Sequence, residues 1–221
     1  MTTPPAARPI RVLLVDDDPM ARAGVRGILE QDPDITVVAE ATDGDEVTVA
    51  ADRHAPDVVL MDLRMQRVDG VTATAMLRRR VRPPQVVALT SFDLDRYVYA
   101  ALEAGAAGFL LKDARPEQIR DAVRIVHSGE AVLSPRSTRH LLNHFAGADS
   151  ERQRQARTGM AQLSDREREI ARLVWEGLSN KQIAHRLHVG EATVKTHLAR
   201  LSAKLDLESR IQIALLVERA G

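Results

Sequence analysis

Residues 58–70 are VVLMDLRMQRVDG, and their first five decide the fold, because four apolar residues end on Asp62. A second apolar run, residues 10–15, ends on the acidic triplet 16–18. Short apolar runs of this kind are typical of strands covered on both faces of a parallel sheet. Open sheets of that class place ligands at the carboxyl ends of their strands. The two runs therefore predict one acidic pocket at a single sheet edge.

Strand and helix patterns alternate from residue 9 to 128, which predicts an α/β domain with a doubly wound, five-stranded parallel sheet of flavodoxin-like type. Asp43 and Asp69 each precede a glycine at a helix start, as helix caps do. The predicted strands are 10–15, 36–39, 58–61, 86–90 and 108–111, and the predicted helices are 20–31, 44–53, 70–80, 94–104 and 116–127.

The pattern changes after residue 128. Residues 129–160 are expected to form a linker, with one short helix from Ser134 to Phe145 and an aperiodic stretch over 146–160. Residues 161–221 are expected to form a four-helix, all-α domain. Ser164 and Glu167 are spaced as a capping box at its start. The predicted helices are 165–176, 180–187, 191–204 and 209–217.

Composition excludes several classes of protein. The 221 residues include no cysteine, which excludes disulfides, thiolate metal sites and thiol nucleophiles. No run approaches the roughly 18 apolar residues of a membrane span, and the first residues lack the layout of a signal peptide. A soluble, cytoplasmic protein is expected.

Charge is distributed unevenly along a chain whose formal net charge is zero. Residues 151–221 carry 13 Lys and Arg against 9 Asp and Glu, whereas residues 1–150 carry 18 against 22. A basic second half is compatible with binding to a polyanion such as nucleic acid, although so small a difference also arises by chance.

Two further groups are expected at the acidic edge, because Thr90 ends the fourth predicted strand and Lys112 follows the fifth. A hydroxyl and an ammonium can bind the oxygens of a phosphoryl group carried on Asp62, since an aspartyl carboxylate can accept phosphate covalently. Asp16 and Asp17 are oxygen ligands suited to Mg²⁺. Each residue alone has an ordinary structural explanation, and Asp18 before Pro19 fits a helix cap better than a metal ligand. The presence of such side chains at the ends of four predicted strands together favours phosphoryl chemistry.

The segments LLVDDD, VVLMDLRMQRVDG, ALTSF and AGAAGFLLKDA lie in the order and spacing of bacterial response regulators, so residues 9–128 resemble a receiver domain. The resemblance implies that a sensor histidine kinase phosphorylates Asp62 and that Thr90 and Lys112 contact the phosphoryl group. It also implies that Phe109 is the aromatic residue that rotates on activation, although core packing explains that position equally well. The implied Mg²⁺ ligands are Asp17, Asp62 and the main-chain carbonyl of Arg64, with Asp16 assisting.

One residue departs from the receiver pattern. Gln66 stands where the family commonly has proline, two residues after Arg64. Losing that proline is expected to relax the loop after Asp62 and to alter phosphate lifetime or ion geometry, but it removes no charged ligand.

The second half contains a candidate helix-turn-helix, in which residues 187–190 join two predicted helices. Ile183, Ala184 and Leu187 give the first helix an apolar face. The second helix has its own apolar face, formed by Val194, Leu198, Leu201 and Leu205. Its opposite face is small, polar and basic, as a helix in a DNA major groove requires, although an ordinary solvated helix face has similar composition.

The segments REREIARLVWEGLSNKQIA and TVKTHLARLSAKL resemble the LuxR-type DNA-binding domain, and its pairing with a receiver resembles NarL/FixJ-type regulators. The resemblance implies base-reading positions at Lys195, Thr196 and Ala199. Gly190 replaces a common serine and is a weaker helix cap. The last helix commonly supplies a dimer surface in this family. The implied phosphate contacts are Lys181, Thr193, His197 and Arg200.

The favoured function is a DNA-binding transcription regulator that is switched by phosphorylation, binds Mg²⁺ and DNA half-sites, and forms a homodimer when phosphorylated. A phosphate-independent regulator that uses its receiver only for dimerisation is the second hypothesis. An enzyme of the aspartyl-phosphatase type is a remote third, because the position of its general acid holds Arg64.

Overall fold

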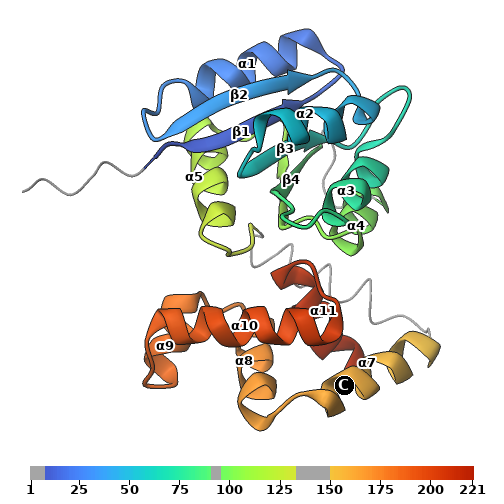
Figure 1. The fold of residues 1–221 in the computed structure, drawn as a ribbon, viewed down its shortest axis with the longest axis vertical. Helices are drawn as coiled ribbons and strands as arrows, with labels where there is room; N and C mark the ends of the chain where they lie inside the picture. The colour runs from blue at the N-terminus through green and yellow to red at the C-terminus, as the bar shows by residue number, and fades with distance from the viewer. Residues whose placement is uncertain (1–7, 91–95, 133–149) are drawn as a thin grey trace, which may run out of the picture.

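The computed structural model describes residues 8–90, 96–132 and 150–221. Its first part is a five-stranded parallel sheet in the order β2-β1-β3-β4-β5 (Figure 1). The order reverses at β1, so the predicted doubly wound sheet is confirmed. The strands are β1 Ile10–Val15, β2 Ile35–Ala41, β3 Val58–Asp62, β4 Gln85–Thr90 and β5 Gly108–Leu111.

Helices cover both faces of the sheet, with α1 and α5 on one face and α2 and α3 on the other. Between residues 44 and 54 the predicted single helix is two elements, the 3-10 helix η1 Gly44–Glu46 and α2. Helix α4 is described from Arg96, so the predicted start at 94 lies outside the described residues. The helices are α1 Pro19–Leu29, α2 Val47–His54, α3 Gly70–Arg78, α4 Arg96–Glu103 and α5 Pro116–His127.

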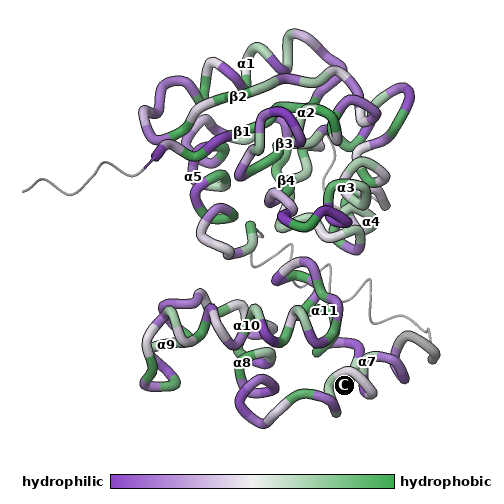
Figure 2. The backbone as a smooth tube through the Cα atoms, viewed as in Figure 1, coloured by the Kyte–Doolittle hydropathy of each residue, from purple (hydrophilic) through white to green (hydrophobic). Residues whose placement is uncertain are grey.

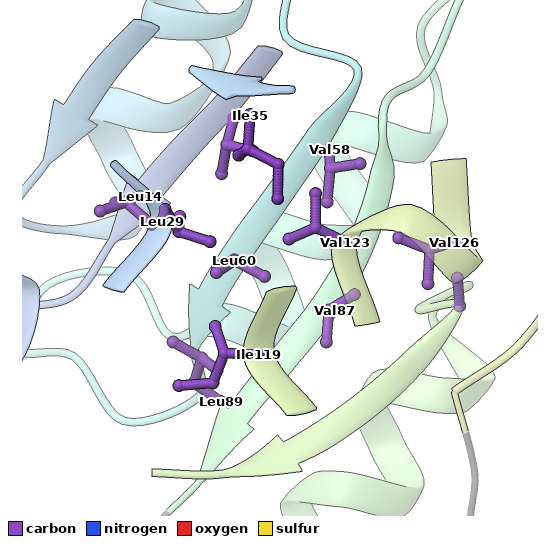
Figure 3. Packing of buried hydrophobic residues seen from close by; sticks show 12 residues of the cluster. Leu14, Leu29, Ile35, Val58, Leu60, Val87, Leu89, Ile119, Val123 and Val126 are labelled. Carbon is purple, nitrogen blue, oxygen red and sulfur yellow. The ribbon is translucent and has the colours of Figure 1, made fainter. Parts of the chain in front are cut away.

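Side chains of the central strands alternate between the two helical layers. Val58 and Leu60 face α1 and α5, where Figure 3 shows Leu60 close to Ile119. Val59 and Met61 face α2 and α3. All five residues of β3 are buried. Burying one such aliphatic side chain contributes about 1.5–3 kcal/mol, so this strand fixes the position of Asp62 at its end.

The second part is entirely helical, and its helices are α7 Ser150–Gln162, α8 Asp165–Trp175, α9 Asn180–Arg186, α10 Glu191–Leu205 and α11 Arg210–Ala220. The predicted capping box of Ser164 and Glu167 is present at the start of α8. Ile183, Val194 and Leu201 are buried in one core, which confirms the predicted apolar faces of α9 and α10. Gly190 is the N-cap of α10 and provides no side-chain hydrogen bond.

The prediction that 146–160 lacks regular structure is wrong from residue 150 onward, because α7 begins there. This helix is mostly hydrophilic (Figure 2) and has no clear apolar stripe, so its sequence gave no periodic signal. Its stability comes from packing on α11. Ala156 is buried, and the Arg157 side chain donates a hydrogen bond to the carbonyl of Ala220. The predicted short helix at 134–145 lies outside the described residues.

Within the described ranges, none of the helices is long and apolar enough to cross a membrane.

Glu167 makes the stability of the helical part depend on pH. Its carboxylate accepts hydrogen bonds from Lys204 Nζ (2.7 Å) and from the main chain of Ser164 (2.9 Å), which lower its pKa from 4.5 to about 2. A carboxyl group with a lowered folded-state pKa stabilises the fold above its unfolded pKa, and this stabilisation is lost as the pH falls from 4.5 towards 2. We expect Glu167→Gln to lower the free energy of unfolding in urea at pH 7, and to lower it less at pH 3.5. An equal deficit at both pH values would contradict this ionic role.

Candidate functional site

The parallel register brings the acidic residues of two strands to one edge. Val15 pairs with Met61 across β1 and β3, so the residues that follow, Asp16 and Asp62, lie side by side at the carboxyl ends of these strands. Both carboxylates are buried. Asp17 is half-buried, and one carboxylate oxygen from each of the three residues lies within 4.8 Å of the other two. The acidic pocket predicted from the sequence is therefore present.

Lys112 lies against this acidic cluster. Its Nζ is 2.8 Å from Asp16 Oδ2 and 2.9 Å from Asp62 Oδ2. The main-chain N–H of Lys112 also donates to the carbonyl of Thr90 (2.8 Å), which joins the ends of β4 and β5 and fixes the buried Thr90 at the same edge. The strand-end residues predicted from the sequence therefore meet at one sheet edge. We call this edge the rim, and it consists of Asp16, Asp17, Asp62, Thr90 and Lys112.

Charge balance within the rim is incomplete, because one ammonium faces three carboxylates. Burial raises the pKa of Asp62, and the nearby Asp16 charge raises it further, whereas contact with Lys112 opposes both effects without cancelling them. Burial alone would lower the pKa of Lys112, but its contacts with Asp16 and Asp62 outweigh burial and raise that pKa. Lys112 therefore stays charged while the rim retains excess negative charge.

These residues fit a hard divalent cation. Within the described part of the chain, Asp16 Oδ2 is buried and has no hydrogen-bond donor in good orientation, although the Lys112 nitrogen is close. Lys112 supplies one positive charge to three clustered carboxylates, so a divalent cation would compensate the charge that remains. Oxygen atoms are the ligands that Mg²⁺ prefers. Asp18 is confirmed as a helix cap, since its side chain accepts from the N–H of Met20 at the start of α1.

The loop after Asp62 begins and ends in contact with the rim. The N–H of Arg64 donates to Asp62 Oδ1 (3.3 Å). The Arg64 guanidinium lies 5.1 Å from the centre of the Tyr97 ring on α4, a cation–π contact that the sequence did not predict. At the far end, a Cβ on Gly70 would lie 2.1 Å from the carbonyl oxygen of Asp62, so only glycine allows this close approach.

Asp43 is the residue of this region whose role the sequence analysis missed. It was predicted to cap the helix that starts at Gly44, but its side chain makes no cap hydrogen bond there. Instead its carboxylate accepts from three N–H groups in the loop after Asp62, including that of Gln66 (3.1 Å). The expected loosening of this loop by loss of proline is therefore opposed by a hydrogen bond that proline could not donate. The position of Asp43 just beyond β2, at the same sheet edge, is the sequence feature that could have indicated this role.

Comparison with known proteins agrees with this geometry. The family model for the response regulator receiver domain matches residues 12–124, and that for bacterial regulatory proteins of the luxR family matches residues 161–217. The chain belongs to the NarL/FixJ-type response regulators. The transcriptional regulatory protein LiaR of Bacillus subtilis is 39% identical over 210 residues, which cover 95% of this chain and 97% of LiaR.

Other relatives also span both domains of this response regulator. The nitrate/nitrite response regulator NarP of Escherichia coli is 39% identical over 213 residues, which cover 96% of each chain. Among solved structures, the response regulator ChrA of a heme-sensing two-component system is 38% identical, with a TM-score of 0.53, over 96% of this chain and 97% of ChrA. The two-domain architecture is therefore shared along nearly the whole length.

Helix α10 presents the predicted DNA-binding face to solvent. Lys195, Thr196 and Ala199 are exposed there. Lys195 makes a long ion pair, 3.7 Å, with Glu191 one turn earlier. Of the predicted backbone-contacting positions, His197 is half-buried and the others are exposed, namely Lys181, Thr193 and Arg200.

The receiver instead covers the last helix, α11. Ile211 and Leu215 of α11 are buried in one apolar cluster with Val98 and Leu102 of α4, and this cluster also contains Phe109. Figure 1 shows α11 as the part of the helical domain nearest to the receiver. Phe109, which is predicted to rotate on activation, and helix α11 of the helical domain therefore contribute to the same apolar cluster.

Polar contacts border this apolar cluster. The Arg78 guanidinium is buried and donates to the carbonyl of Glu208, whose carboxylate lies 3.5 Å from Arg78 Nε. Burial lowers the pKa of Arg78, and the Glu208 charge partly opposes that effect. Glu103 on α4 binds two residues of α11, because its carbonyl accepts from Gln212 and its carboxylate pairs with Arg219 (2.7 Å).

The excess negative charge of the rim predicts a measurable effect of Asp62→Asn. Because the folded-state pKa of Asp62 is raised, its ionised form destabilises the fold at pH 7.5, and this cost decreases as the pH falls through that pKa. In EDTA at pH 7.5 we therefore expect the variant to have a higher Tm than the wild type. Mg²⁺ should raise the Tm of the wild type more than that of the variant. A lower Tm for Asp62→Asn in EDTA would contradict the analysis.

Proposed function

We propose that this response regulator is a cytoplasmic transcription factor switched by transfer of a phosphoryl group from a sensor histidine kinase to Asp62. The observation that carries the proposal is the position of Lys112, whose ammonium touches both Asp16 and Asp62 at the acidic rim. A cation held beside carboxylates at a strand edge can stabilise the equatorial oxygens of a transferring phosphoryl group.

In the proposed reaction, an oxygen of the Asp62 carboxylate attacks phosphorus while the bond between phosphorus and the kinase histidine nitrogen breaks. The imidazole leaves with the bonding electron pair. Asp17, Asp62 and the Arg64 carbonyl would hold Mg²⁺, with Asp16 assisting, and the bound ion would neutralise charge on the phosphoryl oxygens. Lys112 would bind one of these oxygens, and the Thr90 hydroxyl would move to donate to another.

The proposed switch connects this rim to α11. Inward movement of Thr90 would leave space into which Phe109 packs, shifting an existing equilibrium between two receiver surfaces. Phe109 belongs to the same buried cluster as Ile211 and Leu215, so repacking it would weaken the contact of α4 with α11. Released α11 would then be available as a dimer surface, and DNA half-sites about one helical turn apart would be bound by two copies.

DNA recognition is proposed for the exposed face of α10. Lys195 would donate hydrogen bonds to guanine acceptors in the major groove, while Ala199 would offer only apolar contact, for example to a thymine methyl group. Thr196 is less free to read bases, because its hydroxyl donates to the carbonyl of Ala192 (2.9 Å). Contacts to the DNA backbone would come from Lys181, Thr193, His197 and Arg200, which position the helix.

Asp62→Ala tests the phosphorylation site. We expect the variant to fold and to lose labelling by acetyl phosphate or by a kinase, because the acceptor oxygen is absent. Asp18→Ala is the control, because it removes another carboxylate, from the acidic triplet 16–18. Its carboxylate caps α1, so the control should lose about 1 kcal/mol of stability but retain labelling. Undiminished labelling of Asp62→Ala would refute the assignment.

Lys195→Ala tests the DNA-binding face. At matched salt, we expect the variant to bind a captured cognate site more weakly by about 1–3 kcal/mol, the usual range for a base-reading contact. Arg172→Ala removes another exposed positive charge, from α8, and should change affinity much less. Equal affinities of wild type and Lys195→Ala would exclude a base-reading role for this lysine.

A further inference from the structure

The carboxylate of Asp43 holds the loop that follows Asp62. Its Oδ2 accepts hydrogen bonds from the main-chain N–H groups of Gln66 (3.1 Å) and Arg67 (2.9 Å), and its Oδ1 accepts from that of Val68 (2.8 Å). Asp43 as a whole is only 3% exposed. One buried charge is thus compensated by three consecutive N–H groups, an arrangement that fixes the path of the backbone donating them.

A second contact ties the same two segments together. A Cβ on Gly44 would lie 2.4 Å from the carbonyl oxygen of Val68, so the backbone after Asp43 packs directly against the loop. The Arg67 side chain adds ion pairs outside this contact, with Asp45 (2.8 Å) and Glu46 (2.9 Å). The Glu46 carboxylate accepts in turn from both the N–H and the hydroxyl of Thr42.

The loop held in this way carries the proposed main-chain ligand. Arg64 lies between Asp62 and the three residues bound by Asp43, and its own N–H donates to Asp62. The close packing of Gly70 against the Asp62 carbonyl restricts the other end. Asp62, Gly70 and Asp43 therefore all restrain the loop that bears the Arg64 carbonyl, and Asp43 does so with a side chain from beyond the end of another strand.

We propose that Asp43 is a positioning residue for the phosphorylation site, which sets Mg²⁺ affinity by orienting the loop that bears the Arg64 carbonyl. This inference rests on the proposed function. It also accounts for Gln66, because an N–H at this position lets Asp43 perform the restraining role that a proline ring would otherwise perform. Residues that orient metal ligands in this way typically change metal affinity by roughly 10- to 100-fold when they are replaced.

The test is the Mg²⁺ dependence of acetyl-phosphate labelling in the full chain. For Asp43→Ala we expect the Mg²⁺ concentration at half-maximal rate to rise roughly tenfold or more, with most of the rate recovered at saturating Mg²⁺. Asp43→Asn keeps the side-chain volume and one carbonyl acceptor, so it should give a smaller rise and serves where the alanine variant folds poorly. A purely structural role would lower the amount of active protein without changing the Mg²⁺ midpoint.

Asp45→Ala is the matched control. It removes a carboxylate that binds Arg67 through its side chain alone, and it should leave the Mg²⁺ midpoint within about twofold of wild type, because the three main-chain hydrogen bonds remain. Unshifted midpoints in both Asp43 variants, with a wild type that labels normally, would overturn the inference about Asp43 alone. A wild type that takes no label at any Mg²⁺ concentration would instead overturn the proposed function and this inference with it.

Discussion

Repulsion among carboxylates at one sheet edge is the constraint on which the rest of the structure depends. Asp16, Asp17 and Asp62 place oxygen atoms within 4.8 Å of one another, and Lys112 supplies a single compensating charge. The strands that hold these residues are buried on both faces, so the carboxylates cannot relax into solvent without disturbing the core. On the function proposed above, binding of a cation and a phosphoryl group would relieve this repulsion, and the free energy of binding would drive a change of structure.

In the proposed switch, that change would run along β4, β5 and α4 to the helical domain. Thr90 and Lys112 are joined by a main-chain hydrogen bond. Phe109 lies on β5, the strand that leads to Lys112, and packs in a cluster with Ile211 and Leu215 of α11. The face of α10 proposed to read DNA is already exposed, so the receiver does not need to uncover it. Control of DNA binding in this chain would therefore act on the pairing of two copies through α11, and the buried Arg78 contact with Glu208 would oppose that release.

Local sequence predicted the features that depend on periodicity and on strand ends. The apolar runs located the strands, and the rule that parallel strands share a carboxyl edge predicted the cluster of Asp16, Asp62, Thr90 and Lys112. Features that depend on long-range contact were not predicted. Helix α7 has no apolar stripe and is stable because it packs on α11, and Asp43 resembles a helix cap in sequence but binds N–H groups more than 20 residues away. Local preference was overridden by tertiary contact in both cases.

Beryllofluoride mimics a phosphoryl group, so its binding to the rim, followed by ¹⁹F NMR, tests the central claim most directly. With Mg²⁺ present, protein-bound fluorine resonances should appear for the wild type and should be absent for Asp62→Ala. Their absence from the wild type at saturating Mg²⁺ and beryllofluoride, or their persistence in Asp62→Ala, would show that the rim does not hold the ion and the phosphoryl group together.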